Sequence, residues 1–205
     1  MQTKEHWEQV YQTKTPDTVS WFQEHAEHSL QLIHLTGVNH DASIIDVGGG
    51  ASTLVDDLLK AGYHNLTVLD LSGAALEAAK SRLGVLQNKI QWIEADVTRA
   101  SLSVAYYDIW HDRAVFHFLT LAEDRSAYVE LVKRSIKSGG HVIIATFAED
   151  GPTKCSGLPV MRYTSDELQA ELGVSFALIN HEKKAHYTPL GNTQQFNYCR
   201  FKIIG

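Results

Sequence analysis

The sequence predicts an α/β fold of the doubly wound type, in which helices cover both faces of a mostly parallel sheet. Two observations lead to this prediction. Between residues 43 and 147, short apolar runs alternate with segments of helical periodicity, which is typical of strand–helix–strand units. Near the C-terminus, two strand candidates (174–181 and 194–203) follow each other without an intervening helix, so they must pair antiparallel.

The first strand and the first helix of this alternation enclose a glycine-rich turn. The apolar run 43–47 is followed by Gly48-Gly49-Gly50, and apolar residues recur at helical spacing over 53–61. Glycine permits a tight turn and lets a ligand approach the backbone closely. Because the first N–H groups of a helix lack intrahelical partners, the turn is a candidate binding site.

The remaining elements follow from apolar periodicity, capping residues and breakers. A β-branched run at 141–147 predicts a buried strand, and Gly139-Gly140 is expected to end the helix before it. In chain order we expect strand 66–70, helix 73–83, strand 90–94, a short segment 98–104, strand 106–110, helix 124–137, strand 141–147 and helix 164–172, with Thr164 or Ser165 as its cap and Glu167 nearby.

Residues 1–40 precede the first strand and predict two helices. Trp7, Val10 and Tyr11 have helical spacing, and Pro16 breaks this first helix. A second helix carries Leu30, Ile33 and Leu35 and is expected to end near Gly37.

Length and composition predict one domain spanning 1–205 and argue against several functions. The net charge of −6 and the lack of a basic run weigh against nucleic-acid binding. No apolar run is long enough to span a membrane, and residues 1–6 show no signal sequence, so we expect a cytoplasmic protein. Cys155 and Cys199 have no metal-type spacing, and His25 and His28 are expected on a solvated helix face, so no metal site is predicted.

Three acidic residues lie at the carboxyl ends of successive strand candidates: Asp46, Asp70 and Asp96. In doubly wound sheets, ligands bind outside these ends of the strands. A glycine turn followed by an acid on the second strand indicates a nucleoside cofactor. The dinucleotide fingerprint Gly-x-Gly-x-x-Gly is incomplete, however, because residue 53 is threonine.

The pattern Asp46-x-Gly48-x-Gly50, with Asp70 and Asp96, resembles the class I S-adenosylmethionine-dependent methyltransferases. The resemblance covers residues 43–147 and implies a Rossmann-like sheet of seven strands that ends in an antiparallel hairpin. It also implies that the glycine turn passes the methionine moiety, that Asp70 holds the ribose hydroxyls and that Asp96 faces adenine. The residues expected to bind S-adenosyl-L-methionine are Trp21, Asp46, Gly48, Gly49, Gly50, Asp70, Leu71, Asp96, Val97 and His111.

The N-terminal aromatic residues are similar to those of a methyltransferase subgroup that includes enzymes acting on lysines of elongation factor. The similarity lies in Trp7-Glu8-x-x-Tyr11 followed by Trp21-Phe22. It implies that residues 1–40 form a helical cap that folds over the cofactor. Alternatively, these aromatic residues cover the sheet edge, because they bury a large area in either arrangement.

Candidates for a catalytic base are His111, Asp112 and His117, which follow the fourth strand. Histidine titrates near neutral pH, as a base for proton transfer should. The alternatives are a local ion pair between Asp112 and Arg113, and packing of His117 on Phe118. Methyl transfer from a sulfonium requires alignment and desolvation above all, so the enzyme need not contain a catalytic dyad.

The segment 149–163 is predicted to be a long structureless loop on the substrate side of the sheet. We expect Arg113, Cys155 and Arg162 to bind the substrate, with the arginines holding an anionic group. The alternatives are that Cys155 is a buried thiol and that Arg162 pairs with Asp166.

The sequence therefore predicts an S-adenosylmethionine-dependent methyltransferase. The compact chain favours a small-molecule acceptor, and the oligomeric state stays open. The cap favours the rival function, methylation of a protein lysine. A cofactor-binding sensor without catalysis is a further alternative. A short-chain oxidoreductase would need a Tyr-x-x-x-Lys pair after the fourth strand, and none occurs there.

Overall fold

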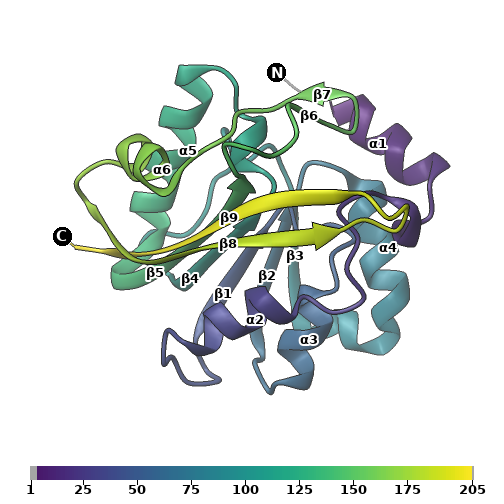
Figure 1. Cartoon of the computed structure of the whole chain (residues 1–205). Coiled ribbons are helices and arrows are strands. Elements are labelled where there is room, and N and C mark those ends of the chain that lie inside the picture. The colour runs from purple at the N-terminus through teal and green to yellow at the C-terminus, as the bar shows by residue number, and fades with distance from the viewer. Residues whose placement is uncertain (1–3, 205) are drawn as a thin grey trace.

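A computed structural model describes residues 4–204, which form a seven-stranded sheet with helices on both faces (Figure 1). The strand order is β3-β2-β1-β4-β5-β9-β8, and only β9 runs antiparallel to its two neighbours. The strands are β1 (Ser43–Val47), β2 (Asn65–Asp70), β3 (Ile90–Glu94), β4 (Tyr107–Arg113), β5 (Ile136–Phe147), β8 (Phe176–Tyr187) and β9 (Thr193–Ile203). The predicted doubly wound fold with a C-terminal hairpin is confirmed.

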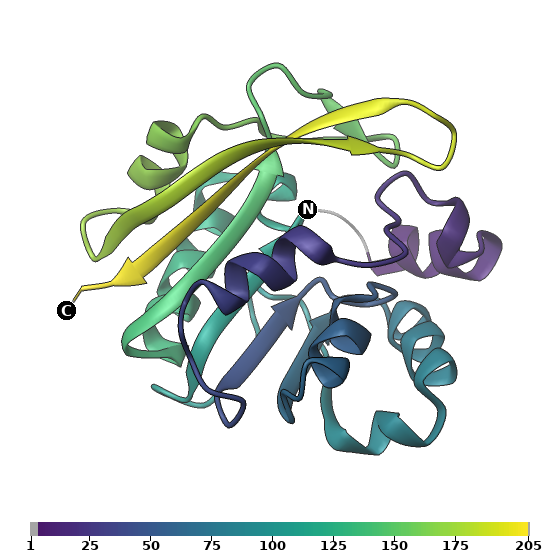
Figure 2. The same cartoon turned by 60° about the horizontal axis from the view of Figure 1, so that its bottom comes forward.

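Two apolar cores lie on opposite faces of the sheet (Figure 2). One packs α5 and α6 against residues such as Val142 and Ile144, and the other packs α2, α3 and α4 against residues such as Ile143 and Ala145. The alternation along β5 follows from the two-residue period of a strand. The helices are α1 (Lys4–Thr13), α2 (Glu27–His34), α3 (Leu54–Lys60), α4 (Gly73–Leu83), α5 (Ala122–Ser135) and α6 (Ser165–Leu172).

Several local predictions are confirmed. The helix predicted over 73–83 and the strand over 90–94 have these bounds in the structure. Helix α6 begins with a capping box, in which Thr164 accepts from the backbone N–H of Glu167 and the Glu167 carboxylate accepts from that of Thr164. Within residues 4–204, no helix is long and apolar enough to cross a membrane.

The prediction that Gly139-Gly140 ends a helix is wrong, because α5 ends at Ser135 and both glycines lie within β5. The register of β5 with β4 shifts between the pairs Tyr107↔Ile136 and Ile109↔His141. Gly139 has φ +74°, and a Cβ on Gly140 would meet Ile136 and the carbonyl oxygen of Lys137. The two glycines therefore permit the irregular pairing of β5 with β4, and they do not end a helix.

Strand β4 continues through residues 111–113, which were predicted to follow it. Because successive side chains of a strand point to opposite faces, His111 and Asp112 diverge. His111 faces Ser29 of α2, whereas Asp112 faces Tyr128 of α5.

The segment 149–163 is more ordered than predicted. It contains a small hairpin of β6 (Lys154–Cys155) and β7 (Leu158–Pro159). The two residues at its tip, Ser156 and Gly157, both have positive φ, as tight two-residue hairpin turns require.

Candidate cofactor and methyl-transfer site

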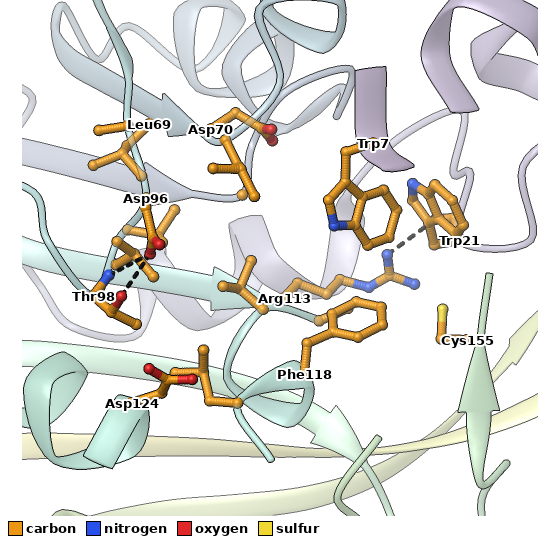
Figure 3. Close-up of a pocket in the computed structure, with 18 of the residues that line it drawn as sticks. Trp7, Trp21, Leu69, Asp70, Asp96, Thr98, Arg113, Phe118, Asp124 and Cys155 are labelled. Carbon is orange, nitrogen blue, oxygen red and sulfur yellow. Dashed lines mark hydrogen bonds between the residues drawn. The ribbon is translucent and has the colours of Figure 1, made fainter. Parts of the chain in front are cut away.

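A pocket opens at the carboxyl ends of β1, β2 and β4, between the sheet, helix α1 and the β6–β7 hairpin (Figure 3). It encloses about 960 Å³, part of which is open to solvent. Its lining includes most of the predicted cofactor residues together with several aromatic side chains: Trp7, Tyr11, Trp21, Val47, Gly48, Leu69, Asp70, Leu71, Ala95, Asp96, Val97, Thr98, Arg113, Ala114, Val115, Phe118, Leu119, Asp124 and Cys155.

The glycine turn is packed tightly against the protein itself. Gly48 has φ +69° and donates its N–H to the carbonyl of Leu69 at 2.7 Å. A Cβ on Gly48 would collide with Val115, one on Gly49 with Asp46 and one on Gly50 with Asp70 and Ala75. The three glycines are therefore required for the packing of neighbouring side chains, in addition to any approach of a ligand.

Asp70, at the end of β2, is buried and lines the pocket. Its Oδ1 accepts from the backbone N–H of Ser72 at 2.8 Å. Burial raises the pKa of Asp70 to about 7, although hydrogen bonds from the backbone of Ser72 and Gly50 oppose the shift. Each carboxylate oxygen has a further lone pair, so Asp70 can accept hydrogen bonds from the hydroxyls of a ribose.

Asp96 follows β3 and lies half-buried in the pocket wall. Its Oδ1 accepts from the backbone N–H of Thr98 at 2.9 Å and from the Thr98 hydroxyl at 2.7 Å, as the dashed lines in Figure 3 show. These two bonds fix the carboxylate and leave Oδ2 as an acceptor for the amino group of a nucleobase.

Asp46 and His111 line a second, smaller pocket and belong to a buried chain of hydrogen bonds. His111 Nδ1 donates to Asp46 Oδ1 at 2.7 Å, and His111 Nε2 lies 2.9 Å from the hydroxyl of Ser29. Since both ring nitrogens are engaged, His111 has no free position with which to take a proton from an acceptor. Asp46 Oδ2 is buried without a partner among the described residues.

Asp112 is fully buried and is absent from the lining of the main pocket. Its carboxylate accepts from the backbone N–H groups of Val115 and Phe116 at 2.8 and 3.0 Å, and from the Tyr128 hydroxyl at 2.6 Å. Burial raises its pKa to about 6. No ion pair with Arg113, the alternative considered from the sequence, is found among the described residues, and the geometry favours a structural role for Asp112 over the predicted catalytic one.

His117 lies in the 3₁₀ turn Phe116–Phe118 and is also fully buried. Its Nδ1 accepts from the backbone N–H of Phe147 at 3.2 Å, and its ring packs edge-on against Phe118. Burial lowers the pKa of His117 to about 3, and the charge of Arg113 contributes. The geometry therefore favours the alternative prediction, packing, over its use as a base.

Arg113 ends β4, lines both pockets and is held by neighbouring oxygen atoms. Its Nε donates to the Tyr198 hydroxyl at 2.9 Å, and one terminal nitrogen donates to the carbonyl of Trp21 at 3.0 Å. The guanidinium lies 4.7 Å from the ring centre of Phe196. It is therefore a fixed positive charge in the wall of the site.

Of the other two residues predicted to bind the substrate, Cys155 lines the pocket and Arg162 does not. Cys155 lines the pocket beside Trp21 (Figure 3), and burial raises the pKa of its thiol to about 12, which keeps it neutral. Arg162 is exposed and donates to the carbonyls of Glu149 and Gly151, not to Asp166. Neither pocket includes Arg162 in its lining.

Helix α1 covers one side of the pocket with aromatic side chains. Trp7 makes edge-to-face contacts with Trp21 and Phe118, and Tyr11 accepts from the Trp21 indole N–H at 3.2 Å. That residues 1–40 act as a cofactor cap remains a prediction, and its residues 1–3 lie outside the described residues.

Sequence reasoning missed Glu8, which fastens α1 to the rest of the site. Its carboxylate accepts from the N–H groups of Gly73 and Ala74, at 2.7 and 3.1 Å, in the first turn of α4. An acid is favourable there because the N-terminus of a helix is partially positive. The sequence places Glu8 between Trp7 and Tyr11, but nothing in it indicates a contact 65 residues away.

The prediction that His25 and His28 are solvated is wrong for His28. His28 packs edge-on against Tyr198, with ring centres 4.6 Å apart, while His25 lies 2.9 Å from an oxygen of Asp57. Within residues 4–204, no group of three or more metal-ligating side chains is close enough to hold a metal ion.

Comparisons with known proteins agree with this fold. The methyltransferase-domain family matches residues 45–144, from β1 into β5. Together with the fold and the pocket, this match identifies the protein as a class I S-adenosylmethionine-dependent methyltransferase. Its cofactor is S-adenosylmethionine. The pocket fits this group, because Asp70 and Asp96 line it and each has carboxylate oxygen left to accept hydrogen bonds.

Among proteins of known function, human EEF1A lysine methyltransferase 2 is 26% identical over 195 residues, which cover 86% of this chain and 75% of the human protein. Burkholderia thailandensis 1,6-didemethyltoxoflavin-N1-methyltransferase superposes with a TM-score of 0.74 at 16% identity, covering 98% of this chain and 87% of that one. N-methyltransferase NodS of Bradyrhizobium japonicum WM9, solved with S-adenosylhomocysteine, gives 0.71 at 15% identity, covering 98% and 100%.

Proposed function

We propose that the protein transfers the methyl group of S-adenosylmethionine to a small-molecule acceptor bound between α1, the end of β4 and the β6–β7 hairpin. The observation that supports this is the composition of that end of the pocket. Trp7, Trp21 and Phe118 surround it, and Arg113 adds a positive charge. A lysine ammonium would meet a charge of its own sign there.

The proposed chemistry is an in-line displacement, for which the cofactor supplies an activated methyl group. The chain contributes orientation and exclusion of water, since the leaving thioether needs no proton. Asp70 and Asp96 hold the nucleoside, and the aromatic side chains of α1 and Phe118 desolvate the reacting atoms. We assign no general base, because both ring nitrogens of His111 are engaged and Asp112 and His117 lie outside the lining of the main pocket.

Methylation of a protein lysine is the second candidate, and the similarity to human EEF1A lysine methyltransferase 2 favours it. The aromatic residues of α1 fit either acceptor, because aromatic walls also accommodate the methylene stem of a lysine. The two candidate functions differ in the charge of the acceptor beside Arg113, because a lysine is an ammonium and a small molecule need not be cationic.

The test uses S-adenosylmethionine labelled on its methyl group and a lysate separated into a small-molecule filtrate and a desalted protein fraction. We expect transfer of label to the filtrate, undiminished when the lysate is first treated with protease. Label that appears in the protein fraction alone would overturn the proposal in favour of the protein substrate.

A further inference from the structure

Arg113 carries a positive charge for which the described residues provide no negative partner. Its two hydrogen bonds go to neutral oxygen atoms, the Tyr198 hydroxyl and the Trp21 carbonyl. Among residues 4–204 it forms no ion pair, and its second terminal nitrogen is buried without any hydrogen-bond partner. Buried polar groups are normally paired, so this nitrogen is an exception that calls for an explanation.

Three titratable groups whose pKa the charge of Arg113 affects, Cys155, His117 and His186, are neutral as well. Burial raises the pKa of the Cys155 thiol to about 12. Burial lowers the pKa of His117 and of His186, and the charge of Arg113 lowers both further. A charge withdrawn from water without a counter-ion costs free energy. Retaining one at this position is explained most simply by an anion that arrives with a ligand.

The position of the guanidinium indicates which ligand this is. Figure 3 shows it directed away from Asp96 and Thr98, toward Trp21 and Cys155. Asp96 is the residue proposed to hold the nucleoside, whereas Trp21, Phe118 and Cys155 lie at the opposite end of the pocket. Trp7 lies there as well and makes edge-to-face contacts with Trp21 and Phe118, so this end of the pocket has aromatic walls.

We propose that the methyl acceptor is an anionic molecule with a flat apolar body, whose carboxylate or equivalent group binds the unpaired nitrogen of Arg113. This inference rests on the proposed function and specifies its substrate class. The aromatic residues hold the apolar body, and the hydrogen bonds to Tyr198 and Trp21 fix the guanidinium so that little side-chain freedom is lost on binding. The same chemistry could come from the carboxylate of the cofactor's methionine, because Arg113 also lines the second pocket.

The experiment separates these two sources by titrating benzoate and benzamide, which share a ring and differ in charge. Both are titrated by calorimetry into the full-length protein saturated with S-adenosylhomocysteine. We expect benzoate to bind about tenfold or more tightly than benzamide, the ratio that one charge-assisted hydrogen bond supplies. The preference should disappear in Arg113→Gln, persist in part in Arg113→Lys and remain intact in the surface control Arg134→Gln.

Three results would overturn the inference. Equal affinity of the two probes for the wild type would show that the site does not select an anion. Competition between benzoate and S-adenosylhomocysteine, or loss of S-adenosylhomocysteine binding in Arg113→Gln, would assign Arg113 to the cofactor. Since the readout is binding, these results do not depend on which lysate fraction is methylated.

Discussion

Asp70 and Asp112 lie at the carboxyl ends of two strands of the same sheet, and their surroundings differ. Both are buried, and burial raises the pKa of both, to about 7 and about 6. Asp70 lines the pocket, whereas Asp112 is absent from its lining and accepts three hydrogen bonds, from the backbone N–H groups of Val115 and Phe116 and from the Tyr128 hydroxyl. A carboxylate at a strand end can therefore either face the pocket or bond neighbouring residues of the protein. Which of the two it does depends on the face of the sheet to which its position in the strand directs it.

The largest effect is expected from Asp112→Ala. It leaves the N–H groups of Val115 and Phe116 and the hydroxyl of Tyr128 without an acceptor in the core. We expect a loss of roughly 3–5 kcal/mol in the free energy of unfolding, measured with denaturant. Tyr128→Phe removes one of these three bonds and should cost less. A change below about 1 kcal/mol combined with loss of methyl transfer would return Asp112 to a catalytic role.

Asp70→Ala should affect binding instead. The ribose hydroxyls lose a charged acceptor, so we expect the Kd for S-adenosylhomocysteine to rise about 10- to 150-fold. Calorimetry provides the measurement, and an unfolding curve as stable as that of the wild type is the control. If Asp70→Ala bound the ligand with wild-type affinity, Asp70 would not hold the cofactor.

The raised pKa of Asp70 predicts opposite pH trends for stability and binding. Its contribution to stability is fully present below its unfolded pKa of 3.8 and is lost as the pH rises through about 7. Asp70→Asn should therefore be more stable than the wild type at pH 8, by about 1–4 kcal/mol without cofactor. Cofactor affinity of the wild type should rise with pH through about 7, and a flat profile would contradict this assignment.

The smallest effect is expected from Glu8→Ala, which releases α1 from the start of α4. Two backbone N–H groups return to water, so we expect cofactor binding to weaken by about 0.5–2 kcal/mol. Glu5→Ala changes an exposed acid of the same helix and is the matched control. Equal effects of the two variants would mean that the contact of Glu8 with α4 does not position the cap.

The fold was predictable because the signals that specify it are local. The period of apolar residues locates β1 to β3 and helix α4, and the Thr164–Glu167 capping box marks the start of α6. The prediction of a helix end at Gly139-Gly140 was wrong because glycine occurs both at helix ends and at irregularities in strands. Only the pairing of β5 with β4 distinguishes the two cases.

The candidate site was predictable where the strand end itself enters the pocket, as with Asp70 and Asp96. It was not predictable for His111, Asp112 and His117. The sequence does not show to which face each position of β4 points, nor that His117 is buried in the 3₁₀ turn after the strand. Ser29 lies 82 residues from its partner His111 and Tyr128 lies 16 residues from its partner Asp112, each on a separate helix. Such partners follow from tertiary packing alone.

The central claim is that Asp70 binds the cofactor and that Asp112 supports the structure. Its most direct test is the titration of S-adenosylhomocysteine into wild type, Asp70→Ala and Asp112→Asn at pH 8. Asp112→Asn retains one carbonyl acceptor for the turn and is the milder substitution for a binding measurement. We predict a Kd within about threefold of the wild type for Asp112→Asn and a rise of at least about tenfold for Asp70→Ala. The reverse order, with affinity lost in Asp112→Asn and retained in Asp70→Ala, would contradict the account.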